Sequence, residues 1–289
     1  MKIKQIAKIT EGQDGVIFGN ELFRFKHRGK CVVYDLGEIE LDRVKELTPT
    51  TTFMLDKVDL IAPHSNSVCF GTEYYAEGDE FPLLYSNVYN NYARCDDRRI
   101  GVCCVYRLRR EGAGFVTSLV QLIEIGFCED AELWKAYPDR HGERPYGNFL
   151  VDREGGYYHA FVMRSEEKGT RYFKFKLPSV SDGELDTELG IRRVVLRVED
   201  ALDYFDCPYH RFIQGAALYN GVIYSAEGFC DNEVNRPAMR LISLEQRRQL
   251  EYIDLMSMGY TVEPEMIDFR DGVCYYSDAE GNLFNLVFE

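Results

Sequence analysis

The stretch QGAALYNGVIYSAEG, residues 214–228, carries a complete β-hairpin signal. Two runs of apolar and aromatic residues flank Asn220 and Gly221 at its centre. An Asn-Gly pair tolerates the positive φ values that a two-residue hairpin turn requires, and alternating side chains are typical of half-buried strands. Gln214 and Gly215 come first. The pattern therefore predicts a polar start, a strand, a tight turn and a second strand.

The same order recurs along the chain. The repeats begin near residues 14, 66, 147, 215 and 265, and an apolar third strand such as residues 239–244 follows each hairpin. A propeller blade needs about 40 to 50 residues, so the wider gaps between repeats require insertions. The five repeats predict five blades.

We therefore predict an all-β chain, a five-bladed β-propeller that occupies residues 1–289 as a single domain. A β-sandwich or a two-domain β protein is the alternative, since these folds also contain many short strands. The repeated order of polar start, hairpin and third strand favours the propeller. Residues 2–9 precede the first hairpin. Because a terminal strand often completes the last blade and removes free sheet edges, we expect them to form the outer strand of blade five.

Several finer expectations follow from local patterns. The polar segments 130–145 and 179–189 are expected insertions, and 41–47 and 131–137 are expected short helices. Residues 73–77 are expected as the second strand of the second repeat, and residues 194–198 as the fourth strand of the third.

Charge and cysteine usage narrow the class of protein. The formal net charge is −14, and an acidic chain repels phosphate backbones, so nucleic acid is not expected as a partner. The nine cysteines show no metal-like spacing and several lie inside apolar runs, where cysteine behaves as a small hydrophobe. No secretory signal or membrane span is apparent, so we expect reduced thiols and a cytoplasmic protein. No phosphate-binding loop or dinucleotide fingerprint appears, and no cofactor or metal is expected.

The polar starts of the repeats are the candidate site. In a propeller the innermost strands begin at one mouth of the central channel, so residues far apart in sequence converge there. Carboxylate, amide and imidazole groups together suit hydrogen bonding to a carbohydrate or a related polyhydroxyl ligand, or to a cation through water. The predicted ligand-binding residues are Asp14, His64, Asn66, Tyr146, Asn148, Gln214, Glu263 and Glu265.

Some of these residues have more than one interpretation. His64 is either a ligand or general base at the mouth, or a structural histidine tied to a neighbouring loop. Glu263 and Glu265 flank Pro264 in an extended stretch, so both carboxylates can point to one side. Such a pair serves hydrolysis, metal binding or simple loop bonding.

Three short motifs at the repeat starts resemble a known group. They are His64-Ser65-Asn66, Gln214-Gly215 and Glu263-Pro264-Glu265. They resemble the β-propeller domain shared by teichoic acid biosynthesis protein C and staphylococcal phage receptor-binding proteins. This resemblance implies a five-bladed propeller that binds bacterial surface glycopolymers or has an uncharacterised role near them. The architecture also resembles that of arabinan-degrading glycosidases, for whose acidic trio Asp14, Glu265 and Asp152 are candidates, although no matching motif is present.

Three functions remain open at this point. The leading one is a binding propeller with a carbohydrate or polyol at the channel mouth. The second is a glycoside hydrolase or lyase that uses Glu263, Glu265 and Asp14. The third is a protein-interaction scaffold that uses the outer loops.

Overall fold

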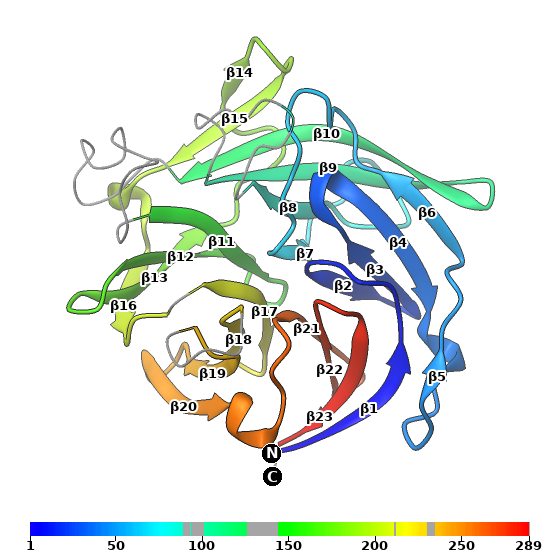
Figure 1. Ribbon diagram of the computed structural model, residues 1–289. Helices are drawn as coiled ribbons and strands as arrows, with labels where there is room; N and C mark the ends of the chain where they lie inside the picture. The colour runs from blue at the N-terminus through cyan, green and yellow to red at the C-terminus, as the bar shows by residue number, and fades with distance from the viewer. Residues whose placement is uncertain (89–92, 94–100, 126–143, 211, 230–234, 289) are drawn as a thin grey trace.

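A computed structural model describes residues 1–88, 93, 101–125, 144–210, 212–229 and 235–288 of the chain. Five β-sheets stand in a ring around a central channel, which confirms the all-β, five-bladed propeller (Figure 1). Helical structure in the described residues is limited to short 3₁₀ turns at His27–Gly29, Leu36–Glu38, Val198–Asp200 and Met256–Met258.

Each blade runs from an inner strand at the channel to an outer strand at the rim. Blade 1 contains β2 (Gly15–Phe18), β3 (Glu21–Phe25), β4 (Lys30–Asp35) and β6 (Thr51–Met54). Blade 2 contains β7 (Val68–Phe70), β8 (Leu84–Val88), β9 (Val102–Glu111) and β10 (Gly114–Ile125). Blade 3 contains β11 (Arg144–Asp152), β12 (Tyr157–Ser165), β13 (Gly169–Lys176) and β16 (Asp203–Cys207). Blade 4 contains β17 (Ile213–Tyr219), β18 (Val222–Glu227), β19 (Ala238–Ser243) and β20 (Arg248–Asp254).

Blade 5 is built from both ends of the chain. It contains β21 (Pro264–Arg270), β22 (Val273–Asp278), β23 (Asn282–Val287) and β1 (Lys2–Lys8), with β5 (Lys45–Glu46) on its outer edge. β1 pairs antiparallel with β23, and Lys2 lies opposite Val287 (Figure 1). The expected closure of the ring by the N-terminal strand is therefore confirmed.

The hairpin turns have the predicted chemistry. Asn220 and Gly221 have φ values of 49° and 72°, and Asp271 and Gly272 have 50° and 78°. Two successive positive φ values are the requirement of a type I′ turn, which matches the twist of the strands on either side.

Four finer expectations were wrong or fall outside the described residues. Residues 41–47 form no helix and include β5, and residues 73–77 form no strand, because β8 pairs with β7 instead. The 179–196 region is an insertion, but its strands β15 (Ile191–Leu196) and β14 (Glu184–Asp186) extend blade 2 by pairing with β10, so 194–198 is not the fourth strand of blade 3. The expected helix 131–137 lies outside the described residues.

The core consists of apolar clusters between neighbouring blades. Blades 1 and 2, for example, share a cluster in which Phe23 packs edge-on against Phe70 and Phe115 at 5.6 and 5.3 Å between ring centroids. Equivalent clusters join each further pair of neighbours around the ring. The six cysteines among the described residues are buried free thiols, consistent with their expected role as small hydrophobes. No helix in the described part of the chain is long and apolar enough to span a membrane.

Candidate functional site: the polar mouth of the channel

Each blade contributes one polar residue: in four blades it lies at or just before the start of the inner strand, and in blade 3 it lies within β11, directly after a register shift. These five residues, which we call the polar ring, are Asp14, Asn66, Asn148, Gln214 and Glu265, and all are buried. Two positions later each strand places an apolar residue, and these five line the channel deeper in: Val16, Val68, Leu150, Ala216 and Ile267. The five apolar residues line the channel, and hydrogen bonds between blades hold the polar residues of blades 1 to 4 together. These five predicted residues lie together at one end of the channel, which we call the start mouth.

Irregular pairing between strands changes the direction of several of these side chains. The register shifts between Arg144 and Asn148 in β11, between Ile213 and Ala216 in β17, and between Pro264 and Met266 in β21. A bulge bends a strand locally and re-aims a side chain, and bulges are frequent beside functional sites. The start mouth is therefore built by deviations from regular pairing, which the sequence pattern did not indicate.

Hydrogen bonds join the polar ring across blades 1 to 4. Asn66 and Asn148 both donate to the carbonyl oxygen of Ile213, at 3.4 and 3.2 Å. Asp14 Oδ2 accepts from the backbone N–H of Val68 at 2.8 Å. The ring is therefore a fixed structure rather than a set of free surface groups.

A buried arginine lies beneath the ring and was missed by the sequence argument. Arg24, in β3, has no exposed surface and donates through Nη2 to the carbonyl oxygens of Gly12 and Asp278, both at 2.9 Å. Its charge acts on Glu265 and Asp14, whereas burial lowers its own pKa. Its place between two phenylalanines in an alternating strand gave no sign of this role.

Several atoms of this layer have no protein partner. They are Asp14 Oδ1, Asn148 Oδ1, Glu265 Oε2 and the Nε and Nη1 atoms of Arg24. Buried polar atoms in folded proteins are nearly always paired, so unpaired ones call for an explanation such as a functional site. Five such atoms lie in this one layer, and four further unpaired hydroxyl groups, those of Tyr85, Tyr106, Tyr158 and Tyr276, lie in the clusters between blades.

Burial shifts the acid–base behaviour of the carboxyl groups. Burial raises the pKa of Asp14 well above its usual value, although hydrogen bonds from Gly15 and Val68 oppose it. Burial also raises the pKa of Glu265 strongly, with Glu263 adding to the effect. Glu263 is less buried, and its pKa is raised to about 7.

The two glutamates differ in exposure and in partner. Glu263 is half-buried and accepts a hydrogen bond from Gln214 Nε2 at 2.7 Å. Glu265 is fully buried and accepts from Gln13 Nε2 at 2.8 Å. Of the two carboxyl groups, Glu263 is therefore the one that solvent can reach.

An aromatic pair stands beside Gln214 and Glu263. Phe212 and Phe229 meet edge to face with 4.5 Å between ring centroids, yet 43% and 38% of their surfaces are exposed. Phe212 has a φ of 51°, which is unusual for a bulky residue, and Ser65 at the start of blade 2 has 64°. Backbone strain of this kind clusters at ligand sites. No repeat position in the sequence indicated this pair.

The remaining predicted residues have different surroundings. His64 is half-buried against His27, with 4.6 Å between their rings, and burial lowers its pKa to about 3. It is therefore neutral at physiological pH. The side chain of Tyr146 lies outside the described residues. No group of three or more His, Cys, Asp or Glu side chains in the described part of the chain is arranged to hold a metal ion.

Comparison with known proteins supports the fold alone. No family model matches the chain. No curated protein matches it either. Among solved structures, a glutaminyl cyclase from Myxococcus xanthus is similar, with a TM-score of 0.50 and 11% identity over 99% of this chain and 93% of that one. BamB from Moraxella catarrhalis (TM-score 0.34, 9% identity, 95% and 71% coverage) and the computationally designed Ika8 protein (0.35, 8%, 99% and 100%) are more distant.

Proposed function

We propose that this propeller binds a small carbohydrate or related polyhydroxyl ligand at the start mouth. The observation that carries the proposal is the exposed pair Phe212 and Phe229 beside the Gln214–Glu263 hydrogen bond. Sugars present an apolar C–H face and a rim of hydroxyl groups. An aromatic surface packs against the C–H face, while amide and carboxyl groups form hydrogen bonds with the hydroxyl groups.

The polar ring supports this site from behind. Gln214 donates to Gly228 at 3.3 Å as well as to Glu263, so its amide is held in one orientation. Held groups bind with a smaller loss of side-chain freedom than free ones. Asp14, Asn66, Asn148 and Glu265 are buried, so they position the contacting residues, and His64 would contribute as a neutral hydrogen-bonding group.

A glycan array followed by calorimetric titration tests the proposal. We expect at least one glycan to bind, and Phe229→Ala to weaken it about tenfold or more through loss of apolar contact. Gln214→Ala should weaken it comparably. Tyr252→Ala, an exposed aromatic on the outer strand β20, is the matched control and should leave binding unchanged. If no glycan binds, or the Tyr252 variant loses as much as Phe229→Ala, the site is wrong and a protein-interaction scaffold becomes the better interpretation.

A glycoside hydrolase or lyase is the second candidate. Its support is the pKa of Glu263, which at about 7 suits a general acid or base near neutrality. Asp14 and Glu265 would be the further carboxyl groups. A panel of polysaccharides, with an N-terminal glutaminyl peptide added because a similar propeller is a glutaminyl cyclase, tests for turnover. Glu263→Gln should lower the rate about a hundredfold or more while binding persists. Turnover that survives Glu263→Gln, Glu265→Gln and Asp14→Asn together would eliminate this candidate.

A further inference from the structure

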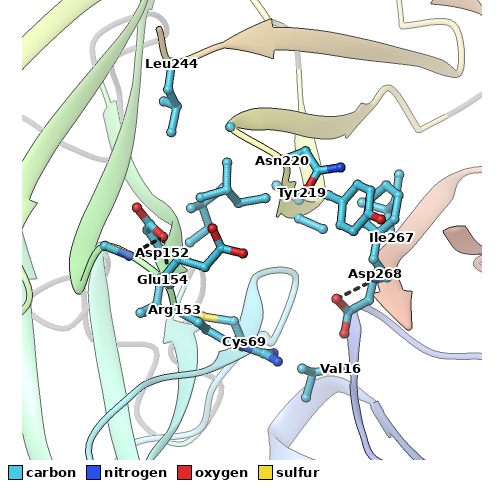
Figure 2. Close-up of a pocket in the computed structure, with 18 of the residues that line it drawn as sticks. Val16, Cys69, Asp152, Arg153, Glu154, Tyr219, Asn220, Leu244, Ile267 and Asp268 are labelled. Carbon is cyan, nitrogen blue, oxygen red and sulfur yellow. Dashed lines mark hydrogen bonds between the residues drawn. The ribbon is translucent and has the colours of Figure 1, made fainter. Parts of the chain in front are cut away.

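The other end of the channel contains an open pocket. It lies where the inner strands end and the hairpin turns follow, which we call the turn mouth, and has a volume of about 540 Å³ (Figure 2). Its inner wall is formed by the five apolar residues that line the channel, which we call the apolar ring: Val16, Val68, Leu150, Ala216 and Ile267. The polar ring therefore lies on the far side of an apolar layer, and the turn mouth is a separate site.

Two opposite charges face this pocket from different blades. Asp268 of β21 and Arg153, which follows β11, enter from opposite walls (Figure 2). Burial raises the pKa of Asp268 and the charge of Arg153 opposes that shift, so the two groups act on each other. Yet no ion pair joins these two described side chains.

Backbone hydrogen bonds hold the two groups in place. Asp268 Oδ2 accepts from the N–H of Ile17 at 2.7 Å and Oδ1 accepts from Phe269 at 2.8 Å. Arg153 donates through Nε to the carbonyl oxygen of Phe70 at 3.1 Å. Asp268 is partly buried, and a charge removed from water is costly unless it is paired, whereas Arg153 is exposed to solvent. Here the two partners are fixed on either side of a space, which favours a molecule that carries both opposite charges.

The other residues that line the pocket indicate which further groups such a ligand would carry. Tyr219 and Phe269 stack face to face at one wall, with centroids 4.4 Å apart and planes at 3°. Asp152 Oδ1 accepts hydrogen bonds from the N–H groups of Glu154 and Gly155 at 3.0 and 2.8 Å. Asp271, just after β21, adds negative charge on the Asp268 side and favours the cationic end of a ligand there, whereas Glu154 lies next to Arg153 on the other wall.

We propose that the turn mouth binds a small zwitterion, an α-amino acid with an apolar side chain. Its ammonium group pairs with Asp268, its carboxylate pairs with Arg153 through the terminal guanidinium nitrogens, and its side chain lies against the apolar ring. Arginine suits the carboxylate because its planar fork matches two oxygen atoms. This site is independent of the carbohydrate site, so either proposal can fail without the other.

Calorimetric titration with free L-leucine and L-phenylalanine tests the proposal directly. We expect one or both to bind the wild-type chain. Isoamylamine, which lacks the carboxylate, and 4-methylpentanoate, which lacks the ammonium group, should each bind about tenfold or more weakly, as loss of one charge-assisted hydrogen bond implies. An amine that binds as well as leucine would indicate a simple cation site and would overturn the zwitterion proposal.

Two variants assign the ends of the ligand. Arg153→Gln, on an exposed residue, should abolish the preference for leucine over isoamylamine, and Asp268→Asn should abolish the preference for leucine over 4-methylpentanoate. Glu263→Gln at the opposite mouth is the matched control and should leave leucine binding unchanged. Circular dichroism checks the fold of Asp268→Asn, and if that variant is unfolded the Arg153 comparison alone decides. No binding of either amino acid, or equal loss in all three variants, refutes the site.

Discussion

Gly215 lies where blades 4, 5 and 1 approach the channel axis, and a side chain there has no room. A Cβ atom at this position would collide with the carbonyl oxygen of Glu265 and would come within 2.6 Å of Asp14 Oδ1. Neither neighbour can retreat easily, since one is backbone and the other is held by Val68. The glycine after Gln214 is thus a packing requirement of the polar ring.

Gly215→Ala is therefore expected to destabilise the fold by about 1–3 kcal/mol, as overpacking of a buried site usually does. Urea denaturation measures the change in the free energy of unfolding. Gly114→Ala is the control, because its nearest neighbour would lie 3.7 Å away in ordinary contact. Equal stability of the two variants would show that the ring can rearrange.

Glu263 predicts a dependence of stability on pH. Its pKa is raised to about 7 in the folded chain, from 4.5 as the ordinary value, because burial disfavours the charged form. Its stabilising contribution is therefore complete below pH 4.5 and is lost as the pH rises through 7.

Removing this carboxyl group tests the sign of that effect. Relative to wild type, Glu263→Gln should gain stability as the pH is raised from 4.5 to 8, measured by urea denaturation across that range. Glu251→Gln, at an exposed site on β20, should track the wild type throughout. A difference between Glu263→Gln and wild type that stays constant with pH would contradict the shift.

At the scale of elements, local sequence signals were sufficient to predict the hairpins. They were not sufficient to predict which distant strands pair. The hairpins at Asn220 and Asp271 follow from two residues each, so the sequence predicts them. The join between β10 and β15 links residues about 70 positions apart in parallel, and no local pattern indicates such a partner. Residues 73–77 are aromatic and strand-like, but Glu73 instead accepts hydrogen bonds from Ser179 and Val180 of the distant insertion.

The N-terminal strand makes the strongest prediction about an element. β1 supplies Ile6 and Ala7 to the core between blades 5 and 1, and both are fully buried. Deleting residues 1–10 removes these contacts and exposes the edge of β23. The thermal midpoint, followed by circular dichroism, should fall by roughly 5 °C or more. Lys4→Ala, at an exposed position of the same strand, should not change it.

At the scale of the molecule, the repeat pattern predicted that the residues of the polar ring converge, and it gave no sign of the pocket at the other end of the channel. The polar ring was predictable because each member stands at the same position of a repeat. The pair formed by Asp268 and Arg153 was not predictable from the sequence. The two residues occupy different positions of their blades and face each other only across the channel. The roles of Arg24 and Phe229 were not predictable for a similar reason, because they depend on neighbours from other blades or other strands.

Closure of the ring by a blade made from both chain ends can be tested by moving those ends. Lys2 and Val287 are paired, so a short linker can join the termini. New ends between Met258 and Gly259, both exposed, would leave blade 5 continuous and the ring closed only by packing between blades 4 and 5. New ends between Gln246 and Arg247, in the turn from β19 to β20, would divide blade 4 and keep a closing strand.

Both permuted chains should fold, because every blade keeps its strands, but the first should unfold at a lower temperature and more rapidly in urea. Thermal and kinetic unfolding of the two chains, which share the same linker, isolates the contribution of the closing strand. Equal midpoints and rates would mean that packing between blades is enough to hold the ring shut.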